Sequence, residues 1–321
     1  MATEATPSAE AGLGASPYVY DLAPDWARLP AGWVLGDVGG VAVDAADNVY
    51  VFHRGQHPLI VFDRHGEVRD SWGDGVFNRP HGVDVGPDGS LYLTDDGDHT
   101  VRKCAPDGTV LLEIGVPGAP APAMSGAPFN RCTHTALSPD GEIYVSDGYA
   151  NARVHKFTAR GELMFSWGSP GDGPGQFNLP HNICTDPGGR VVVADRENHR
   201  IQVFDSLGRL LDTWHGVRRP CALCRARGVE GRIFVGELGH GPSGTPARVS
   251  VLGPEGEVLA RLGDRIGPTQ FRAPHGIAVD KRGDLYVGEV AHRAWSLTNP
   301  GIPAPPDLRT LSKLVRRPIS V

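Results

Sequence analysis

The chain has 321 residues, of which 31 are Lys or Arg and 37 are Asp or Glu, and its formal net charge is −6 at pH 7. Because charges of both signs are mixed along the chain, there is no basic stripe that would neutralise phosphates. No apolar run approaches the roughly 20 residues that span a bilayer. The sequence therefore argues against nucleic acid and membranes as partners.

Residues 1–16 have neither the basic start nor the apolar centre of a secretory signal. The chain has five cysteines, an odd number without the spacing of a disulfide framework: Cys104, Cys132, Cys184, Cys221 and Cys224. Both features suit a reducing compartment, so we expect free thiols and a cytoplasmic protein. Cys221 and Cys224 form a single CxxC without a second pair, which favours buried strand residues over a metal site.

Six similar segments follow one another along the chain, and they begin at Val38, Pro80, Cys132, Pro180, Pro220 and Pro274. Each contains a short apolar strand, a turn such as PDG or EG, and a second strand. A third run follows, and most segments then have a fourth run that ends in Trp or Leu and Gly. The 43 glycines and 28 prolines suit short strands joined by tight turns. Four strands repeated six times predict an all-β fold, a six-bladed β-propeller with four-stranded antiparallel blades.

The two ends of the chain depart from the regular repeats. The sixth segment has AWSLT as its third run and no evident fourth strand after Leu297. A propeller can close by lending an N-terminal strand to its last blade, and the candidates are YVYDLAP and GWVLGDV, which precede the first segment. We expect residues 1–16 to be a flexible lead and residues 17–298 to be one propeller domain. Residues 299–321 are then a tail that packs over the outside or frays.

Three histidines occupy the same place in alternate segments. His81, His181 and His275 each follow a proline immediately before the first strand of segments two, four and six. The other segments have different residues at this place: Gly39, Thr133 and Cys221. Alternate blades of a six-bladed ring are related by about 120°, and first strands line the channel, so the three imidazoles should converge on the axis. Three imidazoles with one open position are the arrangement expected for catalytic zinc.

Further polar residues gather where the second strands end. Five segments place an acid there, which we expect to fasten neighbouring turns: Asp95, Asp147, Asp195, Glu237 and Glu289. Near the same place, the first segment has Arg54, the third adds Tyr149 and the fourth adds Arg196. These ends lie near one face of a propeller, and arginine binds carboxylates through two hydrogen bonds. His134, beside Thr133, is either a further channel-facing group or a turn histidine.

The motifs together resemble a known family. SDGYANARVHKF and ADRENHRIQVF resemble the NHL repeat. With HRGQH at 53–57, FNLPH at 177–181 and the other two PH motifs, the chain from about Val38 to Leu297 resembles the peptidyl-α-hydroxyglycine α-amidating lyase family. The resemblance is strongest between Asp147 and Phe204. It implies a six-bladed propeller with zinc on three histidines, and an enzyme that splits the N–C bond of a carbinolamide into an amide and glyoxylate.

Carried over motif by motif, the resemblance assigns roles to six residues. The zinc ligands are His81, His181 and His275, and the catalytic groups are Tyr149, Arg54 and Arg196. Tyr149 either takes the proton of the carbinol hydroxyl or only orients the substrate. The arginines hold its carboxylate or stabilise developing charge, with His134 as a possible further substrate contact. The family has an aspartate after its third zinc histidine that helps bind a structural calcium ion, and Gly276 stands there in this chain, which argues against calcium.

The expected substrate is a small carbinolamide or another α-hydroxy-N-substituted acid. Two other functions suit the same propeller. One is a metal-dependent hydrolase of the lactonase or esterase kind, although such propellers favour carboxylate and asparagine ligands for calcium. The other is a non-catalytic NHL-repeat scaffold that binds a protein on one face. Such a scaffold needs no metal on its axis, so the metal content of the purified protein separates it from both enzymes.

Overall fold

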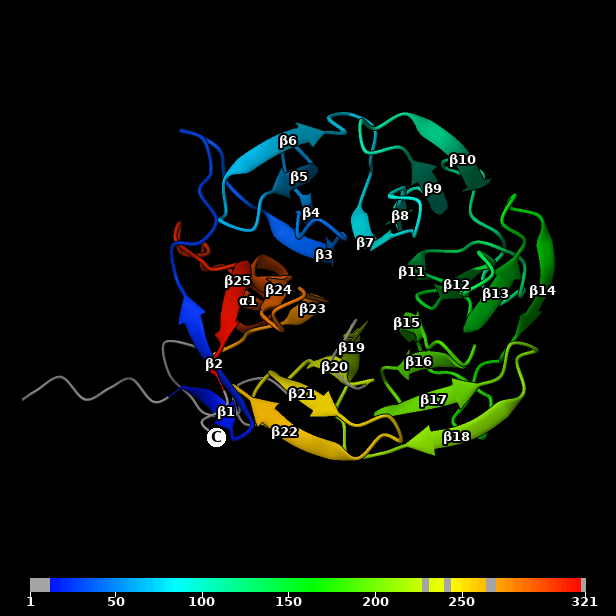
Figure 1. The fold of residues 1–321 in the computed structure, drawn as a ribbon. Helices are drawn as coiled ribbons and strands as arrows, with labels where there is room; N and C mark the ends of the chain where they lie inside the picture. The colour runs from blue at the N-terminus through cyan, green and yellow to red at the C-terminus, as the bar shows by residue number, and fades with distance from the viewer. Residues whose placement is uncertain (1–11, 227–230, 240–243, 264–269, 319–321) are drawn as a thin grey trace, which may run out of the picture.

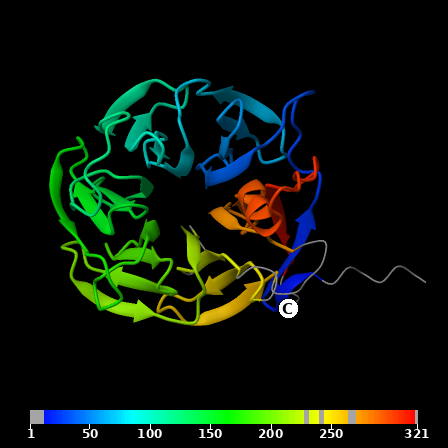
Figure 2. The same cartoon turned by 180° about the vertical axis from the view of Figure 1, so that it is seen from behind.

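The computed structural model describes residues 12–226, 231–239, 244–263 and 270–318. These residues form six β-sheets that stand around a central channel like the blades of a propeller (Figure 1). The view from behind shows the same closed ring (Figure 2). The prediction of an all-β, six-bladed propeller with antiparallel blades is confirmed. Among the described residues, no helix is long and apolar enough to cross a membrane.

The first five blades each consist of four strands that follow one another in the chain. Blade one contains β3 (Asp37–Val43), β4 (Val49–Arg54), β5 (Leu59–Phe62) and β6 (Val68–Trp72). Blade two contains β7 (Pro80–Val85), β8 (Leu91–Asp95), β9 (Thr100–Cys104) and β10 (Val110–Gly115). Blade three contains β11 (Cys132–Leu137), β12 (Ile143–Asp147), β13 (Arg153–Phe157) and β14 (Leu163–Trp167). Blade four contains β15 (Pro180–Thr185), β16 (Val191–Asp195), β17 (Arg200–Phe204) and β18 (Leu210–Trp214). Blade five contains β19 (Pro220–Arg225), β20 (Ile233–Glu237), β21 (Arg248–Leu252) and β22 (Val258–Leu262). In each blade the first strand lies next to the channel (Figure 1).

The sixth blade is built from both ends of the chain. Its strands are, from the channel outward, β23 (Pro274–Val279), β24 (Leu285–Glu289), β25 (Leu311–Arg316), β2 (Tyr18–Ala23) and β1 (Leu13–Ala15). Of the two candidate closing segments, YVYDLAP is therefore the one that supplies the fourth strand. Because the N-terminal strand pairs with the C-terminal strand, hydrogen bonds between the two ends close the ring.

Two boundaries and one strand predicted from the sequence need correction. The third strand of the sixth blade is β25, which lies beyond the predicted domain end at residue 298 and inside the predicted tail. Part of the predicted lead, residues 13–15, forms β1, while residues 1–11 and 319–321 lie outside the described residues. The AWSLT run belongs to the helix α1 (Ala291–Thr298), not to a strand.

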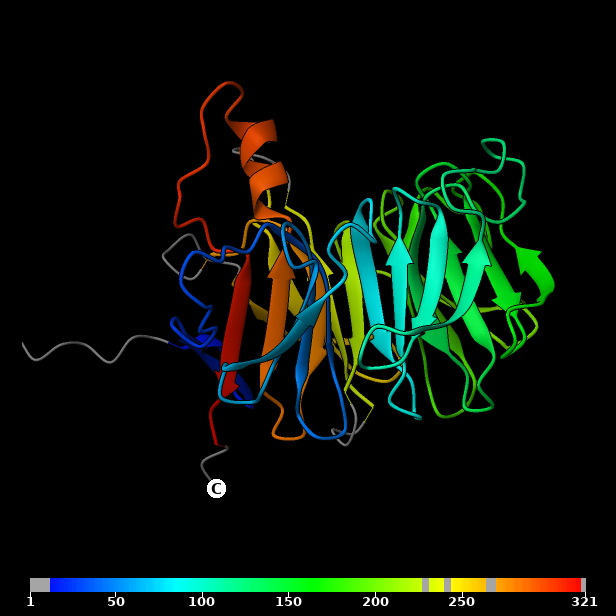
Figure 3. The ribbon, with the colours of Figure 1, turned by 90° about the horizontal axis from the view of Figure 1, so that it is seen from above.

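The helix α1 forms in place of the predicted strand because a side chain of blade one caps its first turn. The Asp37 carboxylate accepts hydrogen bonds from the backbone N–H groups of His292 and Arg293, which have no partner inside the helix. Of the eight helix residues only Ala291 is buried, so the segment does not supply the apolar face that a third strand packs between two blades. Figure 3 shows α1 standing out from one face of the ring.

Apolar side chains fill the space between neighbouring blades. Phe52 and Leu59 of blade one, for example, pack in one cluster with Val83 and Leu93 of blade two. The closing blade is packed in the same way, because Leu314 of β25 is fully buried with residues of blades five and six. A rigid ring of this kind positions the residues that begin the first strands and end the second strands.

We expect Leu314→Ala to lower the free energy of unfolding by about 2–5 kcal/mol, because a buried leucine is lost from the strand that closes the ring. Leu314 pairs with Leu22 on one side and Leu285 on the other. Its neighbour Val315 is 39% exposed, so Val315→Ala is the matched control, with an expected change within about 0.5 kcal/mol. Denaturant unfolding measures both, and equal effects would contradict closure through β25.

Candidate metal centre and active site

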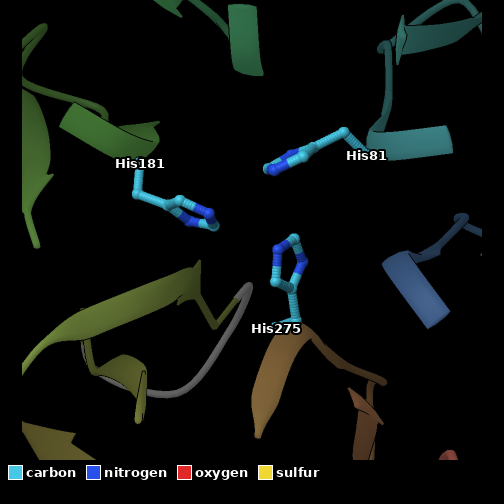
Figure 4. A group of neighbouring side chains, drawn as sticks. All are labelled: His81, His181 and His275. Carbon is cyan, nitrogen blue, oxygen red and sulfur yellow. The ribbon is translucent and has the colours of Figure 1, made fainter. Parts of the chain in front are cut away.

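A β-bulge at the start of every first strand sets the direction of the channel-facing residues. In blade two, Pro80 pairs with Asp95 and Gly82 pairs with Thr94, so His81 is the extra residue between them. The other five blades have the same shift, and the extra residues there are Gly39, Thr133, His181, Cys221 and His275. A bulge re-aims the side chain of its extra residue. His81, His181 and His275 consequently point toward one another across the channel (Figure 4).

The acids at the ends of the second strands hold these bulges in place, as expected. The Asp95 carboxylate accepts hydrogen bonds from the backbone N–H groups of Asn78 and Arg79, at 2.6 and 2.8 Å. The other blades repeat this bond with the following pairs: Asp147 with Asn130, Asp195 with Asn178, Glu237 with Arg218, and Glu289 with Arg272. In blade one, His53 Nδ1 takes the place of the carboxylate and accepts the N–H of Gly36. The loop before each first strand is thus tied to the end of the second strand.

The three channel histidines, called the triad here, each have a fixed ring orientation. Each Nδ1 lies 2.6 to 2.7 Å from the backbone carbonyl at the bulge of the next blade, and the three carbonyls belong to Thr133, Cys221 and Gly39. Because a carbonyl only accepts hydrogen bonds, each Nδ1 carries the proton and each Nε2 keeps its lone pair. Burial lowers the pKa of all three rings well below the usual value, so they are neutral at pH 7.

The triad fits a metal ion. One ring nitrogen from each histidine lies within 4.8 Å of the other two, and this is the one group of three or more possible ligands that the described residues bring together. All three histidines are buried. Neutral imidazoles whose second nitrogen is held by a carbonyl are the usual nitrogen ligands of zinc and of related divalent metals. The convergence predicted from the even spacing of the motifs is therefore present.

Tyr149 lies directly against the triad. Its hydroxyl oxygen is 3.1 Å from His81 Nε2 and 3.0 Å from His181 Nε2, so it faces the lone pairs that a metal would use. Tyr149 follows the end of β12 and reaches over the channel from blade three. Burial raises the pKa of the Tyr149 hydroxyl, while the nearby charges of Arg196 and Arg54 act in the opposite direction.

Arg54 and Arg196 lie near the triad and Tyr149, as the motifs predicted. Arg54 Nε donates to the carbonyl of Pro80 at 3.0 Å, but its buried Nη2 has no hydrogen-bond partner among the described residues. Arg196 Nε donates to Glu197 at 2.8 Å, and its guanidinium carbon lies 5.7 Å from the ring centre of Tyr149. A buried guanidinium group with an unused N–H is costly unless a ligand accepts it. Both groups suit the carboxylate of a bound acid.

The structure places His134 in a different part of the channel. His134 lines a cavity of about 340 Å³ together with the later residues of the first strands, such as Val85 and Thr185, and Tyr149 is not part of its wall. Its ring lies against Gly82, where an added Cβ would come within 2.3 Å of His134 Nδ1. Burial lowers the pKa of His134 to about 4. His134 is therefore a channel-facing group, but it is not brought together with Tyr149 and the two arginines.

Sequence reasoning missed several residues at this site. Arg79 and Arg131, from the loops before β7 and β11, have guanidinium carbons 5.8 and 4.5 Å from the ring centre of Tyr149. The signal for them was their place two residues before the bulge residues His81 and Thr133. Cys221 Sγ lies 3.4 Å from His181 Nδ1. No disulfide joins the five cysteines in the described part of the chain, and Cys221 and Cys224 are not among its grouped metal ligands.

Gly276 stands where the resembling family has an aspartate that helps bind calcium, and its packing leaves little room for a side chain. A Cβ added there would lie 2.8 Å from Gly40 Cα and from Val41 N. Real Cβ atoms do not approach backbone atoms so closely, so a carboxylate-bearing residue at this place would require the neighbouring first strand to move. The residue after His275 therefore contributes no ligand beyond its backbone.

Comparison with known proteins agrees with this geometry. The NHL repeat family matches residues 77–104 and 177–204. The chain is 28% identical over 331 residues to the peptidyl-glycine alpha-amidating monooxygenase of Mus musculus, covering 89% of this chain and 33% of that protein. It is 31% identical over 333 residues to peptidyl-alpha-hydroxyglycine alpha-amidating lyase 1 of Drosophila melanogaster, covering 85% of this chain and 58% of that protein.

A solved structure described as a streptogramin B lyase shares the fold, with a TM-score of 0.61 and 13% identity over 95% of this chain and 99% of that chain. The resemblance to the amidating lyases seen in the motifs is thus confirmed at modest identity, and it extends over most of the chain. The chain spans about a third of the length of the monooxygenases that it matches.

Proposed function

We propose that this chain is a zinc-dependent lyase that cleaves the N–C bond of a carbinolamide, with release of an amide or amine and glyoxylate or a related aldehyde. The observation that carries the proposal is the position of Tyr149, whose hydroxyl lies 3.1 and 3.0 Å from the free Nε2 atoms of two triad histidines. A propeller that served only as a scaffold would not need three convergent imidazoles on its axis with a tyrosine hydroxyl against them. The names of the similar proteins support the same reaction.

His81, His181 and His275 would hold the zinc ion through Nε2, since their Nδ1 atoms are committed to carbonyls. A zinc ion bound there supplies a Lewis acid for the carbinol group. The triad lies at the starts of the first strands, close to Tyr149, Arg54 and Arg196, which follow or end second strands. All the proposed groups therefore lie at one face of the rigid ring.

The residues of the chain account for the proton and the charge. Tyr149 acts as its phenolate, the form that the charges of Arg196 and Arg54 favour, and its oxygen takes the proton of the carbinol hydroxyl. The electron pair left on that oxygen forms the C=O bond of glyoxylate while the C–N bond breaks. The nitrogen keeps the electrons of that bond and takes up the proton that Tyr149 received, so that the amide leaves neutral and Tyr149 returns to its starting form. Arg54 and Arg196 bind the carboxylate next to the carbinol carbon and orient it toward Tyr149.

Incubation with α-hydroxyhippurate tests the proposal, with glyoxylate and benzamide measured as the two products. We expect both products in equal amounts, with and without oxygen, because the reaction transfers no electrons to or from a cofactor. Metal-loaded protein that forms no glyoxylate from any α-hydroxyglycine derivative would contradict the proposal. Hydrolysis of lactones by the same protein would favour the hydrolase instead.

Arg54→Lys is expected to raise KM for the carbinolamide about tenfold while kcat changes much less. Lysine keeps the positive charge but lacks the planar pair of donors that a carboxylate accepts, so substrate binding is weakened more than the chemical step. Steady-state kinetics on α-hydroxyhippurate measure both constants. Arg209→Lys is the matched control, since Arg209 is an exposed arginine paired with Asp205, and a fall in kcat alone for Arg54→Lys would contradict the carboxylate-binding role.

A further inference from the structure

More guanidinium groups surround Tyr149 than one substrate carboxylate requires. Besides Arg54 and Arg196, the guanidinium carbons of Arg79 and Arg131 lie within 6 Å of the Tyr149 ring centre, at 5.8 and 4.5 Å. Arg219 joins the group through Glu197, which it contacts at 2.9 Å. Five arginines from different parts of the chain therefore gather at the triad end of the channel.

The acids in contact with these arginines do not balance them. Asp96 is buried and pairs with Arg79 at 2.5 Å and Arg131 at 2.7 Å, and Glu197 pairs with Arg196 and Arg219. Arg54 has no ion pair among the described residues, although Asp96 and Asp37 act on its pKa. Asp37 already accepts backbone N–H groups of α1. The site keeps a positive excess, which is costly in a partly desolvated place unless an anion binds.

Arg79 and Arg131 share one buried carboxylate, whereas Arg196 pairs with Glu197 and Arg54 makes no ion pair among the described residues. The first two belong to the loops before β7 and β11, whereas Arg54 ends β4 and Arg196 follows β16. A single buried Asp96 oxygen joins the two guanidinium groups and holds them side by side. Their side chains are 32% and 39% exposed, so they keep N–H groups that a ligand can reach. Two guanidinium groups held together in this way suit a carboxylate.

We infer that Arg79 and Arg131, held by Asp96, bind a second acidic group, carried by the acyl part of the substrate. The preferred carbinolamide then has two carboxylates, one next to the carbinol carbon for Arg54 and Arg196, and one on the leaving amide for Arg79 and Arg131. This inference rests on the proposed lyase function for the identity of the substrate. It makes Arg79 and Arg131 specificity-determining residues.

Two matched substrates test the inference. N-succinyl-α-hydroxyglycine carries the second carboxylate, and N-pentanoyl-α-hydroxyglycine is a neutral counterpart of similar length. We expect kcat/KM to favour the succinyl compound by about 10- to 100-fold in the wild type, the range that charge-assisted hydrogen bonds supply. Arg131→Gln and Arg79→Gln should each remove most of this preference, measured as the ratio of kcat/KM for the two compounds within one variant, so that an effect on turnover common to both compounds cancels. Arg209→Gln, at an exposed pair, should retain the full preference.

Binding of an unreactive ligand separates this inference from the lyase proposal. N-succinylglycine lacks the carbinol hydroxyl, and calorimetry should show that it binds the wild type more tightly than N-pentanoylglycine and loses this advantage in both glutamine variants. If kcat/KM is equal for the pentanoyl and the succinyl carbinolamide, the second anion site is wrong and the proposed lyase function is retained. If no carbinolamide is cleaved but N-succinylglycine still binds preferentially through Arg79 and Arg131, the lyase is wrong and the anion site stands. Equal binding of both glycines would overturn the site even if one variant fails to fold.

Discussion

Tyr149→Phe should lower the turnover of a carbinolamide by about 10²–10⁴-fold, the range typical of general acid–base groups, with zinc content and melting temperature close to the wild type. The substitution keeps the ring, which packs against the guanidinium groups of Arg131 and Arg196. It removes one oxygen, the atom that lies 3.1 and 3.0 Å from His81 and His181 Nε2. That oxygen faces the triad nitrogens that would hold a metal, where its phenolate can accept a proton from a bound substrate.

Tyr144→Phe is the matched control for this experiment. Tyr144 belongs to the same blade and is buried, but it packs with Phe204 and other core residues between two blades, away from the triad. Turnover by Tyr144→Phe should remain within a few-fold of the wild type. Unchanged turnover by Tyr149→Phe would remove the tyrosine from the chemical step and leave it a role in orienting the substrate at most.

His181→Ala is expected to abolish tight zinc binding, whereas the wild type should hold close to one zinc ion per chain. Three ligands from three blades leave no substitute when one is lost, and the other described residues offer no further group of possible ligands. Two imidazoles alone do not complete a zinc site of the three-ligand kind. Elemental analysis of protein purified without added chelator measures the metal directly.

His134→Ala provides the comparison for the metal measurement. His134 is a half-buried histidine that also faces the channel, but it lines another cavity and is not one of the grouped ligands. Its loss should leave the zinc content unchanged. Full zinc retention by His181→Ala, or loss of zinc in His134→Ala, would show that the ligand set is wrong.

Much of this protein could be predicted from local pattern. Alternation of apolar residues and turn signals, repeated six times, is sufficient for four-stranded blades in a ring, because each blade buries its faces only against its neighbours. The even spacing of His81, His181 and His275 predicted their convergence, since symmetry brings equivalent residues of alternate blades to the axis. The same logic placed Arg54, Tyr149 and Arg196 at one face.

Other features depend on contacts between residues far apart in the sequence. The last blade closes through β25 and β2, and the AWSLT run becomes a helix because Asp37 of blade one caps it. Local apolar pattern cannot distinguish these outcomes, because the partner that decides between them lies at the other end of the chain.

The chemistry of the site likewise required the tertiary structure. The bulges aim the triad inward, and carbonyls of the next blades fix which ring nitrogen carries the proton. Backbone carbonyls have no sequence signature, so no motif could have revealed this. Arg79 and Arg131 are brought together by Asp96 from a third loop. The sequence by itself determined the ring and the identity of the residues at its axis. The tertiary structure decided their orientation, their protonation and the arginines around them, because these follow from pairing between blades.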